Sequence, residues 1–324
     1  MRLALIDEIR RAVGFDAYAW LLTDPETEVG CAPLADVPWL AELPRQIRFK
    51  YLTSVNRWTR LGGAVAALRA ATADHREASL VWREMLTGYG VNDIASLVFR
   101  DRFGCWAFLQ LWRIDSGAQF MGAEVEFLTE IAGLVTKALR RCQARAFDWL
   151  GRGSDRARCP RAVAGARGES PDARDGEVLR VLVPPDTDRQ PIPAGAYNVA
   201  AQLLAVESSV DDHPPSARVH LAAGVWRTSR AARIGDTVPV DKRDIAVTIE
   251  SASPAERLAL YVRACGLSSR EAELLGHLAT GADTRHIAQM MFLSEHTVQD
   301  HLKSIFAKAG VRSRRTLLTR AVGH

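Results

Sequence analysis

The side chains best suited to recognising a partner lie near the C-terminus, on a stretch whose pattern predicts a helix over residues 295–309. Gln299 and Lys303 are four residues apart and therefore share one helical face, with Asp300 beside them. Glutamine can pair with adenine through two hydrogen bonds, lysine donates to guanine acceptors, and aspartate accepts from the amino group of cytosine. Together these residues predict a surface that reads base edges in double-stranded DNA.

Basic and hydroxyl side chains around this face are better suited to the DNA phosphates, which position a protein without specifying sequence. The predicted DNA-binding set is completed by Arg285, Ser294, His296, Thr297, His301, Lys308, Arg312 and Arg314. Any one of these side chains could equally belong to the solvated face of an amphipathic helix. What favours DNA binding is their combination with helix caps and a common apolar core.

Helix caps place these residues on the second helix of a helix-turn-helix, the unit that inserts that helix into the major groove. Ser268 and Glu271 form a capping box, in which each side chain satisfies a backbone N–H of the first turn. Asp283, Ser294 and Ser313 are suitable N-caps for further helices. Apolar residues at helical spacing give these helices one small core, namely Leu274, Leu275, Leu278, Ile287, Ala288, Met291, Val298, Leu302, Ile305 and Ala309.

A dense motif runs through this stretch, made of Leu267-Ser268-Ser269-Arg270-Glu271, Gly281, Ile287-Ala288, Leu293-Ser294, Thr297-Val298, His301, Ile305, Lys308 and Gly310-Val311. Over residues 267–318 it resembles the LuxR-type helix-turn-helix. The resemblance implies that Gln299, Asp300 and Lys303 occupy the base-facing positions of the family, and that Thr297 and Lys308 lie near the DNA backbone. Asp300 departs from the family pattern, because a neutral or basic residue is usual there.

The composition of the whole chain indicates a multidomain protein without a membrane segment. Its 324 residues are enough for two or three domains, and a net charge of +4 requires any nucleic-acid binding to come from a local patch. The 5 cysteines are widely spaced, and no two of them form a Cys-x-x-Cys pair, so neither a disulfide framework nor a zinc site is indicated. This spacing favours unpaired thiols, with a redox sensor as the alternative. We find no signal peptide and no apolar run that could cross a bilayer, so we expect a cytoplasmic protein.

The order of elements over residues 1–150 predicts an α+β domain. An amphipathic helix over residues 3–13 precedes a short apolar strand over 17–22. Two strands, 93–99 and 105–114, are separated by the turn signal Asp101-Arg102-Phe103-Gly104 and predict a hairpin. A long helix over 123–150 follows, and this order resembles a GAF sensor domain.

The long helix carries an apolar stripe that predicts a homodimer. The stripe consists of Phe127, Leu128, Ile131, Leu134, Val135, Leu139 and Phe147, and it is longer than a small domain needs to cover its own sheet. Pairing through this helix would place two helix-turn-helix units on adjacent half-sites of DNA. The alternative is that the stripe packs entirely within one chain.

Most of the 8 tryptophans lie in residues 1–150, where large rings usually fill the core. The alternative is a pocket for a small-molecule ligand, with Trp20, Trp58 and Trp106 as candidate lining residues and residues 56–58 as a covering segment. The arrangement of Cys, His and paired carboxylates that a metal, haem or catalytic site would need is not found. We therefore expect no enzyme activity, no cofactor and no metal.

The middle of the chain is the least regular part. Residues 151–176 are rich in Arg, Gly, Ala, Asp and Pro, which predicts a linker or a poorly ordered insertion. A strand over 177–183, a helix over 194–206, a hairpin over 217–221 and 225–234 and a strand over 245–249 then resemble a PAS-like module. Within it, Asp211-Asp212-His213 could suggest a metal or acid–base site, but the following Pro214-Pro215 favours a polar loop.

These patterns predict five segments: an α+β GAF-like domain over 1–150, the linker over 151–176, an α+β PAS-like module over 177–252, a connecting helix over 253–265 and an all-α helix-turn-helix domain over 266–324. We expect a transcriptional regulator that binds double-stranded DNA, with RNA polymerase as a further candidate partner. The alternative is a signalling adaptor that uses its helical C-terminal domain to bind another protein. Steep salt dependence would distinguish DNA binding, because phosphate contacts release counterions.

Overall fold

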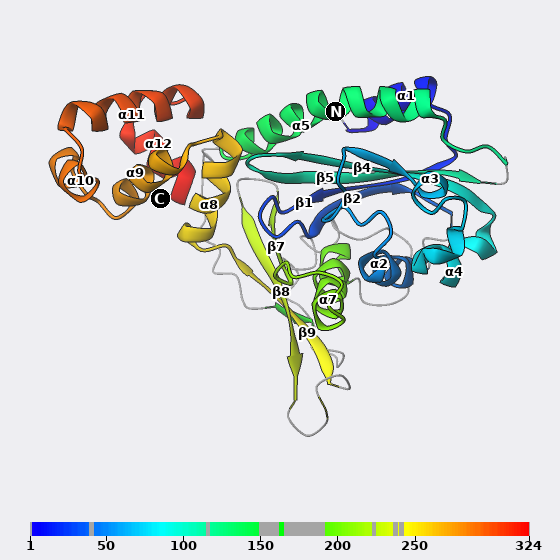
Figure 1. Ribbon diagram of the computed structural model, residues 1–324. Coiled ribbons are helices and arrows are strands. Elements are labelled where there is room, and N and C mark those ends of the chain that lie inside the picture. The colour runs from blue at the N-terminus through cyan, green and yellow to red at the C-terminus, as the bar shows by residue number, and fades with distance from the viewer. Residues whose placement is uncertain are drawn as a thin grey trace.

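The computed structural model describes residues 2–38, 42–114, 117–148, 162–164, 192–221, 225–235, 239 and 243–323. It contains an N-terminal α+β region built on two antiparallel sheets and a helical unit at one end of the molecule (Figure 1). This arrangement agrees with the predicted combination of α+β and all-α parts. The strand predicted over 177–183, most of the linker predicted over 151–176, and the residues Trp39 and Cys159 lie outside the described residues.

The larger sheet has five strands in the order β2-β1-β5-β4-β3, all paired antiparallel. The strands are β1 (Ala17–Thr23), β2 (Gly30–Asp36), β3 (Val65–Ala67), β4 (Val91–Asp101) and β5 (Gly104–Ile114). The predicted hairpin is confirmed, because β4 pairs with β5 up to Asp101 and Gly104. Gly104 has a φ of +148°, and a Cβ there would lie 2.2 Å from the carbonyl oxygen of Pro25, so this turn requires glycine.

Helices cover both faces of this sheet, which is why β4 and β5 are buried along most of their length. On one face lie α1 (Arg2–Ala12) and α5 (Gly122–Arg145), and on the other lie α2 (Leu43–Leu52) and α7 (Ala194–Glu207) (Figure 1). The short helices are α3 (Leu68–Ala71) and α4 (Leu80–Glu84), with 3-10 turns at Arg76–Ala78 and Leu86–Tyr89. None of the described helices is long and apolar enough to span a bilayer.

The apolar stripe of α5 packs against its own sheet. Leu128, Val135 and Leu139 are buried in one cluster with residues of β4 and β5. Leu134 is the exception, since it is 69 % exposed. The surface that the sequence predicted as a homodimer interface is therefore largely occupied within one chain, because the stripe is needed to cover the sheet.

The smaller sheet has four antiparallel strands in the order β6-β9-β8-β7. They are β6 (Ala162–Ala164), β7 (Ser216–His220), β8 (Trp226–Ile234) and β9 (Asp244–Ser251). The predicted hairpin and last strand of the middle region are confirmed, as is the helix before them. β6 lies within the predicted linker and pairs with β9, which corrects that part of the prediction.

Helix α7 packs against both sheets and corrects the predicted division into separate domains. It contacts α2 and β2 of the first sheet layer and β8 and β9 of the second. Val199 and Ala205 share a cluster with Tyr51 of α2 and Phe108 of β5. A helix that is apolar on several sides must be buried on several sides. The residues predicted as a separate PAS-like module therefore share a core with the N-terminal sheet.

The chain ends in helices α8 (Pro254–Cys265), α9 (Ser269–Ala279), α10 (Thr284–Met290), α11 (Glu295–Ala309) and α12 (Arg314–Val322). Ser253 and Glu256 form the expected capping box at the start of α8. Helix α8 contacts both α5 and α12, so it joins the helical unit to the helix layer of the first sheet (Figure 1).

An aromatic cluster lies at this junction. Phe147 stacks on Trp226 of β8 with ring centroids 4.6 Å apart, and meets Tyr261 of α8 edge-on at 5.2 Å. Arg263 of α8 donates to the carbonyl oxygen of Phe103, in the β4–β5 turn, at 3.0 Å. The helical unit is therefore in contact with both sheets of the N-terminal region.

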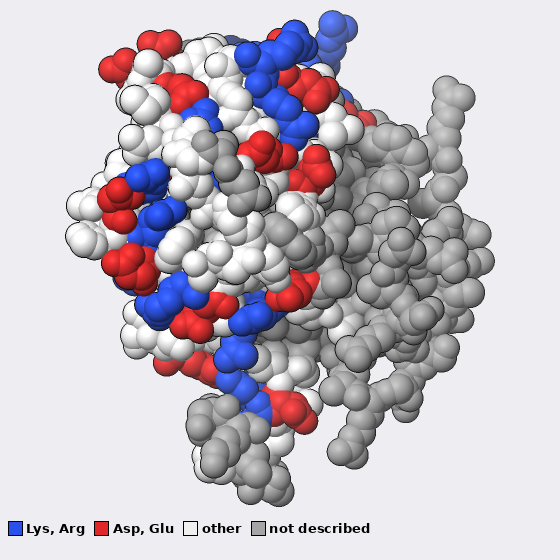
Figure 2. All heavy atoms as spheres, turned by 90° about the vertical axis from the view of Figure 1, so that its right-hand side faces the viewer, with Lys and Arg blue, Asp and Glu red and all other residues white. Residues whose placement is uncertain are grey.

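The end of the molecule that carries α4 has mixed charge (Figure 2). Lys and Arg side chains are interspersed there with Asp and Glu (Figure 2). Arg45 pairs with Glu42 at 3.3 Å, and Arg69 pairs with Asp74 at 2.7 Å. Interspersed charge of this kind does not form the continuous basic surface that a phosphate backbone requires. The described residues of this face are therefore poor candidates for contact with nucleic acid.

Two leucines of α5 test the packing of its stripe. Leu139→Ala should lower the free energy of unfolding by about 2–5 kcal/mol, because it removes buried side-chain volume and leaves a cavity. Leu134→Ala, on the exposed side of the same helix, should change it by no more than about 0.5 kcal/mol. Denaturant unfolding of the two variants checks this, and equal losses would contradict the assigned helix face.

Candidate nucleic-acid interface and ligand pocket

Four N-caps define the helical unit, and each acts as the sequence predicted. Ser268 accepts a hydrogen bond from the backbone N–H of Glu271 and belongs to a complete capping box. Asp283, Ser294 and Ser313 each accept from the N–H three residues later, at 2.7, 3.0 and 3.1 Å. These caps fix where α10 and α11 begin, and so which residues of α11 face outward.

The inner face of α11 is anchored by apolar residues, and its outer face is polar. Val298 and Ile305 are completely buried against residues such as Leu274 and Ile287 of the neighbouring helices. Leu302 and Ala309 are only partly buried, at the margin of the same cluster. Since α11 is held along one side only, its other side is available to a major groove.

Glu271 fixes α11 against the start of α9. Its carboxylate accepts from Ser304 Oγ at 2.7 Å and from Lys308 Nζ at 2.8 and 2.6 Å, both on α11. It also accepts from the backbone N–H of Ser268 at 2.6 Å. Burial alone would raise the pKa of Glu271, but the hydrogen bonds from Lys308, Ser268 and Ser304 lower it to about 2. The sequence predicted the capping box but not the contacts of Glu271 with α11.

The predicted DNA-binding residues lie on one helical unit, and most are open to solvent. Arg285, Ser294, His296, Gln299, Asp300, Lys303, Lys308 and Arg312 are exposed, whereas Thr297, His301 and Arg314 are half-buried. The caps use two of them, since the hydroxyl groups of Ser294 and Thr297 lie 2.8 Å apart. The structure thus brings together, on α11 and its flanks, the residues that the sequence grouped by spacing.

Internal ion pairs modify the roles of two lysines. Lys308 is paired with Glu271 and serves to position α11, which differs from the backbone contact that the family resemblance implied. Lys303 donates to Asp300 at 2.9 Å, and His296 lies 3.5 Å from the same carboxylate. Because the Lys303–Asp300 pair is well exposed, solvent screens it and a base edge can compete for the ammonium.

Phe292 is a feature of the turn that the sequence analysis missed. It lies between α10 and α11 with a φ of +55°, and its side chain is 94 % exposed. A positive φ is uncommon for a residue with a side chain, and an exposed phenylalanine is costly in water. Its neighbours Met291 and Leu293 are buried or half-buried, which leaves Phe292 as the outward residue of the turn.

Comparison with known proteins places this unit in a family. Residues 266–321 match the model described as bacterial regulatory proteins, luxR family. They form a LuxR-type helix-turn-helix domain. Outside this LuxR-type domain, the family model makes no statement about the chain.

Curated relatives match a short part of the chain. The chain is 47 % identical to the probable HTH-type transcriptional regulator GfsR of Streptomyces halstedii over 58 residues. These residues make up 18 % of this chain and 24 % of that protein. It is 44 % identical to the probable csgAB operon transcriptional regulatory protein of Salmonella typhimurium over 48 residues. That match makes up 15 % of this chain and 22 % of that protein. The chain thus spans about a quarter, or less, of the length of these relatives.

A solved structure aligns with nearly the whole chain at low similarity. The crystal structure of Escherichia coli SdiA covers 99 % of this chain and 89 % of its own, with 13 % sequence identity and a TM-score of 0.30. A score of this size supports no conclusion about fold or ligand. The description of the N-terminal region therefore rests on its own sheets and helices.

A cavity lies between the first sheet and helices α2 and α7. Its volume is about 70 Å³, and its walls are mainly apolar, with Leu21, Ile47, Leu86, Phe108 and Trp112 among them. Polar groups also line it, namely Gln46, Lys50, Tyr51, Gln110 and Asn198. An apolar cavity with a few polar groups is the usual form of a small-molecule site.

The three candidate tryptophans do not share this cavity. Trp20 is buried 5.7 Å from the ring of Phe99, in the cluster on the α1 and α5 face. Trp106 is in the same cluster and donates to Asp101 at 3.0 Å. Trp58 is buried on the other face, so residues 56–58 do not form the covering segment that the sequence suggested. Ring size alone could not reveal which side of the sheet each tryptophan faces.

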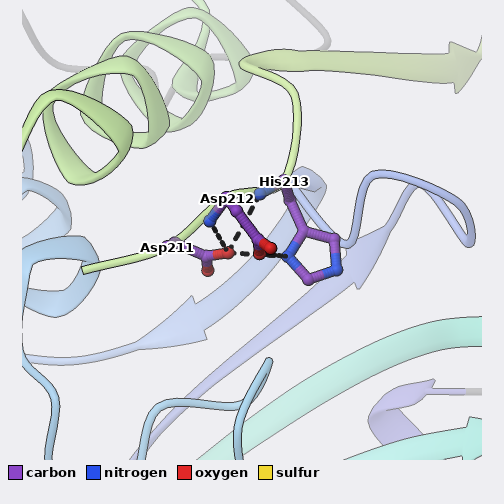
Figure 3. Close-up of side chains that lie close together, drawn as sticks. All are labelled: Asp211, Asp212 and His213. Atoms are coloured by element: carbon purple, nitrogen blue, oxygen red, sulfur yellow. Dashed lines mark hydrogen bonds and ion pairs between the residues drawn. The ribbon is translucent and has the colours of Figure 1, made fainter. Parts of the chain in front are cut away.

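Asp211, Asp212 and His213 offer ligand atoms within 4.8 Å of one another, the spacing of a metal site (Figure 3). The carboxylate of Asp211 is already fully engaged. Oδ1 accepts from the backbone N–H of Asp212 and His213 and lies 2.6 Å from His213 Nδ1. Oδ2 accepts from Arg57 Nε at 2.6 Å and from Thr59 Oγ1 at 2.8 Å. The group therefore acts as an anchor, and the expected polar loop holds a buried charge.

The described cysteines give little support to a redox sensor. Burial raises the pKa of both Cys31 and Cys105 to about 12, which suppresses the reactive thiolate. Cys142 is exposed, and Cys265 is half-buried. No disulfide joins any of these four residues. The four described cysteines are therefore thiols outside any disulfide, as the sequence predicted.

Replacing Glu271 should loosen α11 in a pH-dependent way. The pKa of Glu271 is about 2 in the folded protein and 4.5 ordinarily, so its stabilising effect is complete above pH 4.5 and is lost as the pH falls towards 2. Glu271→Gln should cost roughly 1.5–3 kcal/mol at neutral pH and flatten the acid dependence of unfolding. The control is Glu273→Gln, in an exposed pair with Arg270. If the stability of the wild type and of Glu271→Gln fell in parallel with decreasing pH, the role of Glu271 in fixing α11 would be contradicted.

Neutralising Asp211 should be far more damaging than neutralising its neighbour. Asp211→Asn leaves the buried guanidinium of Arg57 without its counterion and should lower the free energy of unfolding by about 3–5 kcal/mol. Asp212 has a side chain that is 97 % exposed, so Asp212→Asn should change it by about 0.5 kcal/mol at most. Denaturant unfolding measures both, and similar small effects would show that the carboxylate is dispensable.

Proposed function

We propose that this chain is a sequence-specific DNA-binding transcriptional regulator whose N-terminal α+β region controls the LuxR-type domain. The observation that carries the proposal is the exposed polar face of α11, set on a capped and fully packed helix-turn-helix. Gln299 and Lys303 are proposed to read base edges in the major groove, and Asp300 to bias the choice of base. We assign phosphate contacts to Arg285 and Arg312, which are exposed and near the ends of the unit.

The N-terminal region is proposed to act as a small-molecule sensor of a GAF-like kind. The support is the cavity between the first sheet and the helices α2 and α7. Helix α7 leads through the Asp211 loop into β7 and β8, and Trp226 of β8 lies in the aromatic cluster against α8. A ligand that shifts α7 would therefore act on elements that touch the DNA-binding unit.

Two copies are proposed to bind adjacent half-sites, since one helix-turn-helix makes few base contacts. Because the α5 stripe is mostly buried within the chain, we assign no interface to it. RNA polymerase is a candidate partner once the protein is on DNA. The alternative function is a signalling adaptor, in which the outer face of α11 binds a protein. Binding through this face would then lack the steep salt dependence of phosphate contacts.

A selected DNA site allows the two kinds of contact to be separated. Gln299→Ala should weaken binding to the best site by about 1–3 kcal/mol and relax preference at one base pair. Arg312→Ala should weaken binding to all sequences and reduce the salt slope by about one. The control is Arg270→Ala, an exposed arginine paired with Glu273 on α9. Fluorescence anisotropy at several salt concentrations measures these effects, and unchanged affinity and preference in Gln299→Ala would refute the docking of α11.

A further inference from the structure

Lys50 of α2 is a buried cation without a counterion. It is 9 % exposed, and it lines the cavity between the first sheet and α7. Its ammonium lies 5.5 Å from the ring centroid of Trp58 and 5.7 Å from that of Phe108. These aromatic faces attract a cation weakly. No hydrogen bond or ion pair to Lys50 comes from any residue that the structure describes.

The nearest buried carboxylate is already used by another cation. Arg57 is 1 % exposed, pairs with Asp211, and also donates to Gln202 Oε1 at 2.9 Å. Both oxygens of Asp211 accept from other donors, so Asp211 does not serve Lys50. Burial and the charge of Arg57 lower the pKa of Lys50 to about 7. Two buried cations thus share one buried anion, and the cavity beside Lys50 lacks a negative charge.

Asn198 of α7 also lines this cavity, but its side-chain oxygen is closed off from it. It is completely buried, and its Nδ2 donates to the carbonyl oxygen of Ala194 at 2.8 Å. Its Oδ1 has no hydrogen-bond partner among the described residues. A buried acceptor without a donor is costly, and native proteins rarely leave one unmet. The cavity therefore presents one unpaired polar group, the ammonium of Lys50 on α2.

We propose that this cavity binds a small aromatic carboxylate, whose anionic group pairs with Lys50 and whose ring lies against Phe108 and Trp112. The proposal rests on the sensor role proposed above and names the class of ligand. Among the described lining residues Lys50 alone is charged, which suits a single negative charge and leaves a doubly charged phosphate uncompensated. At about 70 Å³ the cavity excludes a long acyl chain, and it would have to widen between α2 and α7 to admit an aromatic ring.

Matched acid and amide probes test the proposal on the full chain, without DNA. Phenylacetate should bind the wild type tighter than phenylacetamide by roughly 10- to 100-fold, the range expected for a charge-assisted hydrogen bond. Lys50→Met and Lys50→Gln should remove this preference for the acid. Lys137→Met, an exposed lysine on α5, should behave as wild type. Isothermal titration calorimetry gives the affinities, and circular dichroism checks that each variant is folded.

Two further readouts separate binding at Lys50 from adventitious binding. At pH 8 most of Lys50 is neutral, so binding an anion there should take up protons, seen as a heat that depends on the buffer and is lost in Lys50→Gln. Phenylacetamide, which is uncharged, should give no such buffer-dependent heat in the wild type.

The outcomes that would overturn the assignment are equal binding of acid and amide, acid binding retained in both Lys50 variants, or no acid binding at millimolar concentration. Because none of these measurements involves DNA, they are independent of whether α11 recognises a DNA site. Loss of DNA binding with acid binding intact would refute the proposed regulator function and leave the ligand class standing.

Discussion

The ion pair between Arg57 and Asp211 is the interaction on which the N-terminal region depends. Arg57 follows α2 and Asp211 follows α7, so the pair joins two segments that are far apart in sequence and lie side by side over the first sheet. Its cost of desolvation is offset only because nearly every donor and acceptor has a partner, including Thr59 and Gln202. With the two helices fixed in this way, the space between them and the sheet becomes a defined cavity.

The same anchor ties the cavity to the second sheet. After Asp211 the chain enters β7, where Arg218 donates to Asp24 at 2.6 Å in the turn that follows β1. β7 pairs with β8, and Trp226 at the start of β8 packs on Phe147 beside α8. A continuous set of packed and hydrogen-bonded contacts therefore leads from the cavity to the helix that precedes the DNA-binding domain. Such contiguity is the physical basis on which occupation of the cavity could bias the position of α8.

The sequence predicted what depends on local chemistry and missed what depends on distant partners. Caps such as Ser268 and Asp283 act within one turn, so their residue types revealed the helix starts. The β4–β5 hairpin was likewise visible, because its two strands and turn are contiguous. The role of Asp211 was hidden, since its partner Arg57 is 154 residues away. The placement of α7 was hidden for the same reason, because an apolar helix does not reveal which sheet it covers.

Lys50 differs from the other buried charges of the described core in having no counterion and no hydrogen-bond partner. Elsewhere buried charges are satisfied: Arg218 is paired with Asp24 and Glu271 with Lys308. A leucine or methionine in place of Lys50 would avoid the desolvation of an ammonium, so stability alone does not account for the lysine. Local rules of folding are usually broken where function requires it. Lys50 breaks this rule in a cavity that lies between α2 and α7, so a ligand that pairs with it would contact the two helices that the Arg57–Asp211 pair already joins.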